Sequence, residues 1–259
     1  MSHQSLPLRC PARVSSPLQL GSPSGHQWLA VSGFIPYRFL VTYRSPARAL
    51  LPLLPRGLAL DTHADHAFLS VCALEVRSMG IRGAPSFLRF DSLEFLYRLA
   101  VRLRGRSTFI TLRSDVSSRV LAYLGRYFSH YRPRLATFAA RGGGGFQRLE
   151  CVSADGHGDA VLEAERVPGF RPAASVFGSA AEASDFLLGM DFSADVDAAG
   201  RVQLQDIEHS PWNASFAKLH AARFAYVERL GAALGVPLVL DHALGMRDIR
   251  QLWKAARWQ

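Results

Sequence analysis

The sequence predicts an α+β fold: one β-rich domain with mostly antiparallel strands and a few helices. Hydrophobic residues make up 49% of the 259 residues, which is ample for a packed core. Many apolar or alternating segments of strand length lie between turn residues, and few segments have helical periodicity. We find no internal repeat and no linker after residue 30, so residues 28–259 are expected to form a single domain.

Residues 1–27 are rich in Ser, Pro, Gly and Arg and contain no acidic residue, which is typical of a flexible leader. No apolar run approaches the roughly 18–20 residues that span a bilayer, and no secretory signal pattern is present. Cys10, Cys72 and Cys151 are widely spaced, which argues for a reducing compartment and against a disulfide framework or a cysteine zinc site. We therefore expect a cytoplasmic protein without a metal or cofactor.

The net charge of +9 is unevenly distributed, since residues 1–141 carry +13 and residues 142–259 carry −4. Only Lys218 and Lys254 are lysines, so 28 of the 30 basic residues are Arg. Arg richness commonly reflects the codon bias of a GC-rich genome. The functional alternative is an anionic ligand or nucleic acid, because Arg binds carboxylates and phosphates in a bidentate geometry.

In the first third of the chain, strands are predicted at residues 38–43 and 67–77. A short helix at residues 47–51 separates them, because Ser45 and Pro46 form a helix N-cap followed by proline at the first helical position. The run FLSVCALEV within residues 67–77 is almost continuously apolar, which suits a strand buried on both sides.

The stretch 93–134 has the clearest pattern. Residues 93–103 alternate with period two, so that Glu94, Leu96 and Arg98 share one face of a strand. A turn at Gly105 leads to a second strand at residues 107–113. Ser114 or Asp115 is then expected to cap an amphipathic helix over residues 116–128.

The rest of the chain alternates between predicted strands and helices. Strands are expected at residues 135–140, 146–153, 160–167, 201–209 and 236–240. Ser179 and Glu182 form a capping box that opens a helix to about residue 188, and a long helix is expected over residues 214–234. The four glycines at 142–145 indicate a turn rather than a phosphate loop, because no Lys-Ser/Thr pair follows and no helix begins there.

A cluster of polar side chains follows the central helix: His130, Tyr131, Arg132 and Arg134. One interpretation is an anion-binding and acid–base site, since the cluster offers an imidazole, a phenol and two fixed cations. The alternative is a solvated basic turn. Two interpretations are also open for Glu94 and Arg98. Their strand face could line a barrel interior, where both side chains would meet a ligand, or it could face solvent.

A second cluster lies at Asp206, Glu208, His209 and Trp212. Carboxylates beside a histidine can be catalytic, and carboxylates at alternating strand positions can also be an exposed edge. The sequence His63-x-Asp65-His66 lacks a second ligand pair, so a polar turn is favoured over a metal site. No GxSxG, HExxH or GxGxxG motif is present.

Several segments resemble the acetoacetate decarboxylase-like superfamily. The opening RFLVTYRSPARALLPLLPRGLALD resembles that superfamily, and the match is closer to its YqjF-like branch, the DUF2071 family. The resemblance extends through LEFLYR, SDVSSRVLAYLGRYFSHYR, SAAEASDFL and EHSPW, over roughly residues 35–250. It implies a curved antiparallel sheet that closes, barrel-like, around a cavity, with the helices outside.

The sequence also departs from the decarboxylases that it resembles. Those members use a lysine pair after the central helix, one of which forms a Schiff base, whereas this chain reads HYRPR there. The acidic partner expected near residues 77–85 is also absent. The resemblance therefore implies a cationic floor in which Arg132 or Arg134 replaces the amine, suited to a carboxylate or enolate.

The leading hypothesis is a small-molecule enzyme of this superfamily without the Schiff-base lysine. It would act on an anionic or carbonyl-bearing metabolite by acid–base chemistry of the lyase, isomerase or cyclase type. Its catalytic residues would be His130 or Tyr131 as proton donor and Glu94 as base or orienting group. Its substrate-binding residues would be Arg98, Arg132, Arg134, Glu208, His209 and Trp212.

Two hypotheses of other classes stay open. The same cavity would serve a non-catalytic protein that binds a small ligand. The basic first half would serve nucleic-acid binding, which is less favoured because the chain contains no recognised nucleic-acid module. A homo-oligomer is also expected, and the sequence identifies neither the substrate nor the reaction.

Overall fold

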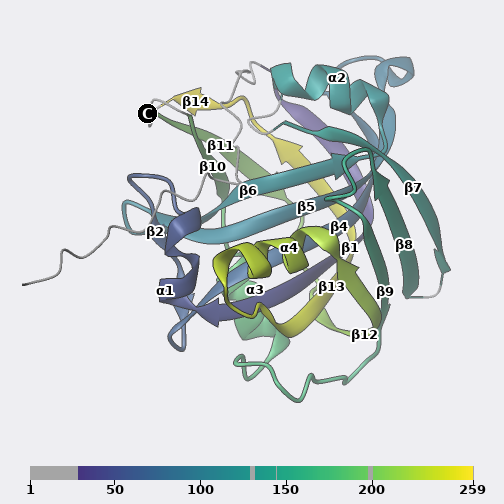
Figure 1. Ribbon diagram of the computed structural model, residues 1–259. Coiled ribbons are helices and arrows are strands. Elements are labelled where there is room, and N and C mark those ends of the chain that lie inside the picture. Colours follow the sequence, from purple (N-terminus) through teal and green to yellow (C-terminus); the bar gives the residue numbers. More distant parts are fainter. Residues whose placement is uncertain (1–28, 129–131, 144, 198–200, 259) are drawn as a thin grey trace, which may run out of the picture.

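The computed structural model describes residues 29–128, 132–143, 145–197 and 201–258 of the chain, with the side chains of 126–128 excluded. His130 and Tyr131, the predicted proton donors, lie outside the described residues. Figure 1 shows a strongly curved sheet that runs through most of the molecule, with short helices packed against it. The predicted β-rich single domain is confirmed.

Nine strands form a hydrogen-bonded path that returns to its first strand, and we call this path the ring. In spatial order its strands are β1 (Val31–Pro46), β4 (His66–Ile81), β5 (Phe90–Leu103), β6 (Arg106–Val116), β7 (Arg134–Gly143), β8 (Phe146–Ser153), β9 (Ala160–Arg166), β12 (Ser215–Phe224) and β13 (Val239–Trp253). Strands β6 and β7 pair in parallel over two residues, whereas the other neighbours in the ring are antiparallel. The sheet is therefore mixed rather than purely antiparallel.

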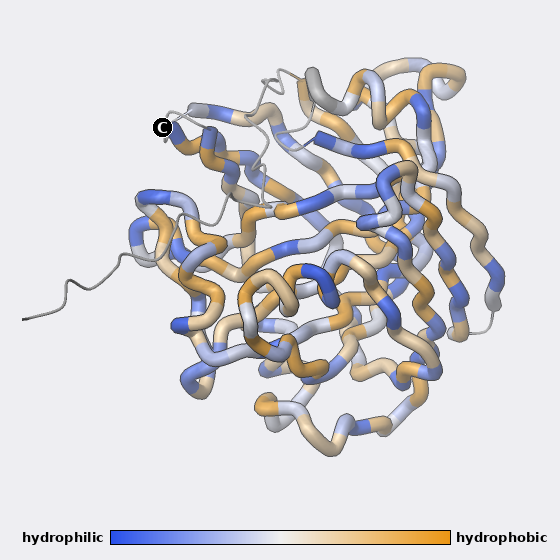
Figure 2. The backbone as a smooth tube through the Cα atoms, viewed as in Figure 1, coloured by the Kyte–Doolittle hydropathy of each residue, from blue (hydrophilic) through white to orange (hydrophobic). Residues whose placement is uncertain are grey.

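The remaining elements cover the ring or extend it. Strands β10 (Phe192–Val196), β11 (Val202–His209) and β14 (Arg257–Trp258) continue the sheet from β13, and β2 (Ala59–Leu60) and β3 (Thr62–His63) are short additions to β5 and β4. The helices are α1 (Ala47–Leu50), α2 (Arg119–Phe128), α3 (Ala180–Leu188) and α4 (Ala225–Leu234), with 3₁₀ turns at Leu51–Leu53 and Ser86–Leu88. Figure 2 shows hydrophilic and hydrophobic residues alternating along the strands, as expected for a sheet with two distinct faces.

One face of the ring points inward. All nine ring strands contribute side chains to a single buried cluster, whose largest fully buried members include Phe39, Phe95 and Tyr97, and helix α4 packs into it through Val227 and Leu230. The opposite, outer face of β13, β1, β4 and β5 carries a second buried cluster that also contains residues of α2 and α3. Helices α2 and α3 therefore bury the outer face of these strands, and the candidate site lies on that face.

Two helices are not capped as the sequence predicted, and α2 begins at Arg119 rather than at residue 116. The predicted cap at Ser114 or Asp115 is wrong, because β6 continues to Val116 and the hydroxyl of Ser118 accepts a hydrogen bond from the amide of Leu121, at 3.3 Å, in the first turn of α2. Ser45 likewise does not cap α1, and its hydroxyl donates instead to the carbonyl oxygen of Pro237.

The predicted helix over residues 214–234 is wrong in its first half. Residues 215–224 form β12, which pairs with seven residues of β9, and only residues 225–234 are helical. A β-bulge between Leu219 and Ala221 shifts the phase of the alternation, so that the apolar spacing imitates a helix. The last strand, predicted at 236–240, instead spans the 15 residues of β13 and includes Asp241 and His242.

The capping box that opens α3 is confirmed. The Ser179 hydroxyl accepts a hydrogen bond from the Glu182 amide at 3.1 Å, and the Glu182 carboxylate accepts one from the Gly178 amide at 2.7 Å. The first bond satisfies an amide that the helix N-terminus would otherwise leave unpaired, and the second ties the helix to the residue before its cap. Helix α3 is thereby fixed at its first turn, against the outer face of the ring.

Candidate functional site: a buried Arg–Glu layer

The strand register places two charged side chains in one row across the outer face of the ring. Arg38 of β1 lies opposite Leu74 of β4, and Leu74 lies opposite Glu94 of β5. Directly paired residues of neighbouring strands point to the same side of a sheet, so Arg38 and Glu94 project into the same layer. We call this region the Arg–Glu layer.

The Arg38 guanidinium is buried and forms no ion pair with a carboxylate of the described residues. The residue is only 3% exposed, its Nε donates to the Cys72 sulfur at 3.0 Å, and its Cζ lies 5.1 Å from the centre of the Trp212 ring. Among the described residues, no carboxylate oxygen lies within ion-pair distance of it. A buried cation normally requires a paired anion, because desolvation of an isolated charge costs several kcal/mol. Arg38 is therefore suited to receive an anion from a ligand.

Glu94 is the carboxylate of this layer and is 4% exposed. Burial raises the pKa of Glu94 to about 7, an effect partly offset by the charge of Arg98, a hydrogen bond from Ser92 and the charge of Arg38. Its Oε1 atom is buried and has no hydrogen-bond partner among the described residues. A carboxyl group with a pKa near neutrality can both give and take a proton, as general acid–base catalysis requires.

Arg98 lies four residues beyond Glu94 on the same strand. A β-bulge between Tyr97 and Arg98 adds one residue to β6, and the Arg98 Cζ lies 4.1 Å from the centre of the Phe109 ring. Arg98 is opposite Ser70, in a polar row that the strand pairing continues on both sides: His242, Thr42, Ser70, Arg98 and Thr111. The outer face thus carries two rows of polar groups, one at Arg38 and Glu94 and one at Arg98.

A buried Asp–His pair lies at one end of the second row. Asp241 Oδ1 accepts hydrogen bonds from His242 Nδ1 at 2.7 Å and from the Ser175 hydroxyl at 2.6 Å, while Oδ2 pairs with Arg44 and accepts from the Val176 amide at 3.2 Å. Burial favours the neutral acid, but these hydrogen bonds outweigh it and lower the pKa of Asp241. The ionised Asp241 thereby fixes the segment before α3 to β13.

The second ring nitrogen of His242 is unsatisfied. Nε2 is buried and has no hydrogen-bond partner among the described residues, and the ring makes edge-to-face contacts with Phe177 and Phe216. With Nδ1–H donated to Asp241, Nε2 of the neutral imidazole is an acceptor. His242 is a second candidate acid–base group of the outer face.

The structure brings part of the predicted EHSPW cluster to the Arg–Glu layer. The Arg38 guanidinium lies over the Trp212 ring, and the centres of the Trp212 and His209 rings are 3.9 Å apart. Trp212 Nε1 donates to the Leu188 carbonyl at 3.0 Å. Glu208, by contrast, is exposed and pairs with Lys254 at 2.5 Å. Trp212 therefore reaches Arg38 and His209 contacts Trp212, whereas Glu208 is exposed.

The HYRPR segment is not brought to Glu94 by its described residues. Arg132 is exposed, and Arg134 pairs with Asp155 at 2.9 Å. Asp155 also binds Arg113, whose Cζ lies 5.9 Å from the Tyr226 ring and whose other partner is Asp115. Arg134 thus belongs to a separate ion-pair network at an end of the ring.

Glu94 and Arg98 were expected either inside a barrel or in solvent, and the structure shows a third arrangement. Their face is the outer face of the ring, where a covering layer buries Glu94. Sequence reasoning missed Arg38, Cys72 and His242. The available signal was a charged or titratable residue inside an otherwise apolar strand, at Arg38 in RFLVTY and at His242 in LVLDHALG.

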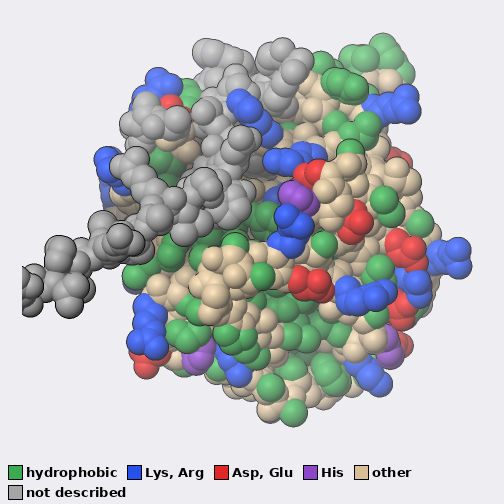
Figure 3. All heavy atoms as spheres, viewed as in Figure 1, with side chains coloured by type: hydrophobic (Ala, Val, Ile, Leu, Met, Phe, Trp, Pro, Cys, Tyr) green, Lys and Arg blue, Asp and Glu red, His purple; other side chains and the backbone are tan. Residues whose placement is uncertain are grey.

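Other types of site find little support in the described part of the chain. No group of three or more His, Cys, Asp or Glu side chains within it could hold a metal ion. Nor is any helix there long and apolar enough to cross a membrane. On the face shown in Figure 3, Lys and Arg lie beside Asp and Glu rather than forming one continuous basic surface.

Solved structures with this architecture share the fold at low sequence identity. Acetoacetate decarboxylase from Legionella pneumophila subsp. pneumophila str. Philadelphia 1 has a TM-score of 0.60 at 12% identity, covering 100% of this chain and 98% of that one. The enduracididine biosynthesis enzyme MppR complexed with pyruvate has a TM-score of 0.59 at 14% identity, covering 90% of each chain. An acetoacetate decarboxylase-like enzyme from Sphingomonas wittichii RW1 has a TM-score of 0.58 at 13% identity, covering 95% and 97%.

The fold is thus that of the acetoacetate decarboxylase-like proteins. The chain belongs to the DUF2071 family of uncharacterized conserved proteins, whose model matches residues 37–244. Both resemblances that the sequence indicated are confirmed. No curated protein sequence matches the chain.

Proposed function

We propose that the Arg–Glu layer binds a small metabolite that carries both a carboxylate and a carbonyl group. The observation that carries this proposal is the buried guanidinium of Arg38, which forms no ion pair among the described residues. A ligand carboxylate would provide the missing charge in a water-poor environment, where charge-assisted hydrogen bonds are strong. The pyruvate bound to MppR, a protein of the same fold, is a molecule of this class.

The proposed chemistry is proton transfer to or from an enolate. Glu94, with a pKa raised to about 7, would remove or return a proton at the carbon beside the carbonyl group. Arg38 and Arg98 would stabilise the negative charge that develops on the enolate. His130, Tyr131 and Arg132 keep the roles that the sequence predicts for them, as candidate donors and cation. This reaction type belongs to lyases, isomerases and cyclases.

An imine mechanism is not part of the proposal. Lys218 is exposed on β12, and Lys254 pairs with Glu208 near the end of the chain. A Schiff-base lysine must be held unprotonated by desolvation or by neighbouring cations, and neither lysine has such surroundings.

A non-catalytic function of the same site is the alternative. It is favoured because helix α3 and the segment before it bury the outer face, on which Phe177, Ala183 and Leu187 pack. A protein that only binds a ligand needs such a cover but no group poised for proton transfer. The raised pKa of Glu94 favours the enzyme.

The two functions are separated by following pyruvate in D₂O by ¹H NMR. An enzyme that forms the enolate exchanges the methyl protons of pyruvate for deuterium, whereas a binding protein shows saturable line broadening without exchange. Glu94→Gln should abolish exchange while retaining binding, and Arg38→Met should weaken binding about tenfold or more. His130→Ala tests the predicted donor. Pyruvate binding that is equal in the wild type and in Arg38→Met would refute the proposed site.

A further inference from the structure

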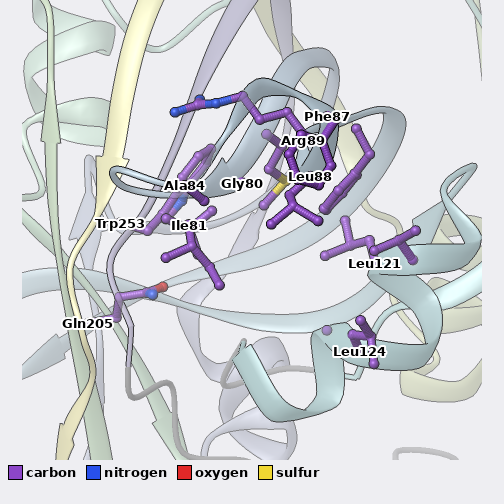
Figure 4. A pocket seen from close by; sticks show the side chains of 15 residues that line it. Gly80, Ile81, Ala84, Phe87, Leu88, Arg89, Leu121, Leu124, Gln205 and Trp253 are labelled. Carbon is purple, nitrogen blue, oxygen red and sulfur yellow. The ribbon is translucent and has the colours of Figure 1, made fainter.

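An apolar cavity of about 410 Å³ opens at the protein surface beside helix α2. Figure 4 shows its wall, to which α2, the connection between β4 and β5, and the end of β13 all contribute. Val31, Met79, Phe90, Leu121 and Trp253 are among its lining residues. Its volume lies within the range of about 300–1,000 Å³ that is typical of sites for small molecules.

Large apolar side chains surround the mouth of this cavity and remain exposed. Phe87 is 81% exposed, Leu88 is 57% exposed and Leu124 is 47% exposed. Single exposed apolar residues are common, but a group that borders an apolar cavity marks a binding surface.

A basic hollow of about 900 Å³ adjoins the cavity, and Arg89 lines both of them. The hollow also contains Arg82 and Arg250. Among the described residues, none of these three guanidinium groups has a carboxylate within ion-pair distance, and Arg89 donates only to the Ser78 carbonyl, at 2.9 Å. The carboxylate of Glu208 in the same hollow is neutralised by Lys254. Three uncompensated cations therefore lie next to an apolar cavity.

We propose that this paired cavity and hollow form a binding site for an amphipathic anion, such as a fatty acid. The acyl chain would fill the apolar cavity between α2 and β13, where burial of each methylene group is favourable. The anionic head would lie at Arg89, within reach of Arg82 and Arg250. Each half of the ligand then meets a surface of matching chemistry.

This site is distinct from the proposed catalytic layer. Neither Arg38 nor Glu94 lines the cavity or the hollow. His209 lines the hollow and also packs on Trp212, so the two sites are neighbours. Fatty-acid binding goes beyond the proposed function, and it can hold or fail independently of pyruvate binding.

Calorimetric titration with dodecanoate, below its micelle concentration, tests the inference on the full chain. Wild type should bind one dodecanoate saturably, and butanoate, which lacks most of the tail, should bind at least about 100-fold more weakly. Val120→Glu places a charge on the cavity wall at a half-exposed position and should weaken binding about tenfold or more. Arg89→Gln should weaken it about fivefold, and added salt should then have less effect.

The matched control is Val152→Glu, because Val152 is an exposed valine on β8 that does not line the cavity. This variant should bind dodecanoate like the wild type. Equal dodecanoate affinity in the wild type, Val120→Glu and Arg89→Gln would overturn the inference. Binding to phosphatidylglycerol vesicles without binding of free dodecanoate would also overturn it, since it would identify a membrane surface rather than a single acyl ligand.

Discussion

Replacement of Glu94 by Gln should stabilise the protein above neutral pH. Burial raises the pKa of this carboxyl from 4.5 to about 7. The folded protein therefore holds a proton that the unfolded chain has lost, and stability falls as the pH rises from about 4.5 to about 7. At about 1.4 kcal/mol for each pH unit between these two pKa values, the destabilisation at high pH is about 3.5 kcal/mol. Gln removes this penalty because it cannot ionise.

Urea unfolding at a series of pH values measures the effect. Between about pH 5 and about pH 8.5, the unfolding free energy of wild type should fall by about 2–3 kcal/mol relative to that of Glu94→Gln. Glu208→Gln is the matched control, because Glu208 is an exposed carboxylate, and it should leave the pH dependence of wild type intact. If the difference between wild type and Glu94→Gln is the same at both pH values, Glu94 is not a buried carboxyl with a raised pKa.

Three further predictions concern other buried charged groups of the molecule. Asp241→Asn should lower the free energy of unfolding in urea by about 3 kcal/mol. The stabilisation by ionised Asp241 is lost as the pH falls below about 4, because the pKa of Asp241 is lowered in the folded protein, so the variant should lose less stability in acid than the wild type. Gly158→Ala should lower the melting temperature, since a Cβ atom there would overlap the Asp115 carboxylate, whereas Gly143→Ala, with open space, should not. Asp195→Asn should show the pH dependence of Glu94→Gln, because burial raises the pKa of Asp195 to about 7.

The sequence predicted most strands because their pattern is local. The alternation over residues 93–103 and the apolar run at 67–77 correspond to β5 and β4, and the capping box at Ser179 marks the start of α3. Strand β12 was missed because a bulge disrupts its period, and only its pairing with β9 makes it a strand. Strand β10 is short and depends on its pairing with β11.

The candidate site was only half predictable for a related reason. Glu94 and Arg98 share a strand, so the period of two places them together. Arg38 lies 56 residues before Glu94, and only the order of β1, β4 and β5 brings the two into one row. The sequence also could not show that the outer face of the ring is buried, because helix α3, which covers it, comes much later in the chain.

We propose above that Arg38 receives the carboxylate of a small ligand, and a crystal structure of the protein soaked with pyruvate would show this contact. Pyruvate should lie in the Arg–Glu layer, with a carboxylate oxygen about 2.7–3.0 Å from the Arg38 guanidinium and the methyl carbon facing Glu94. Pyruvate bound elsewhere, with the Arg38 guanidinium still in contact only with Cys72 and Trp212 at saturating concentration, would contradict it.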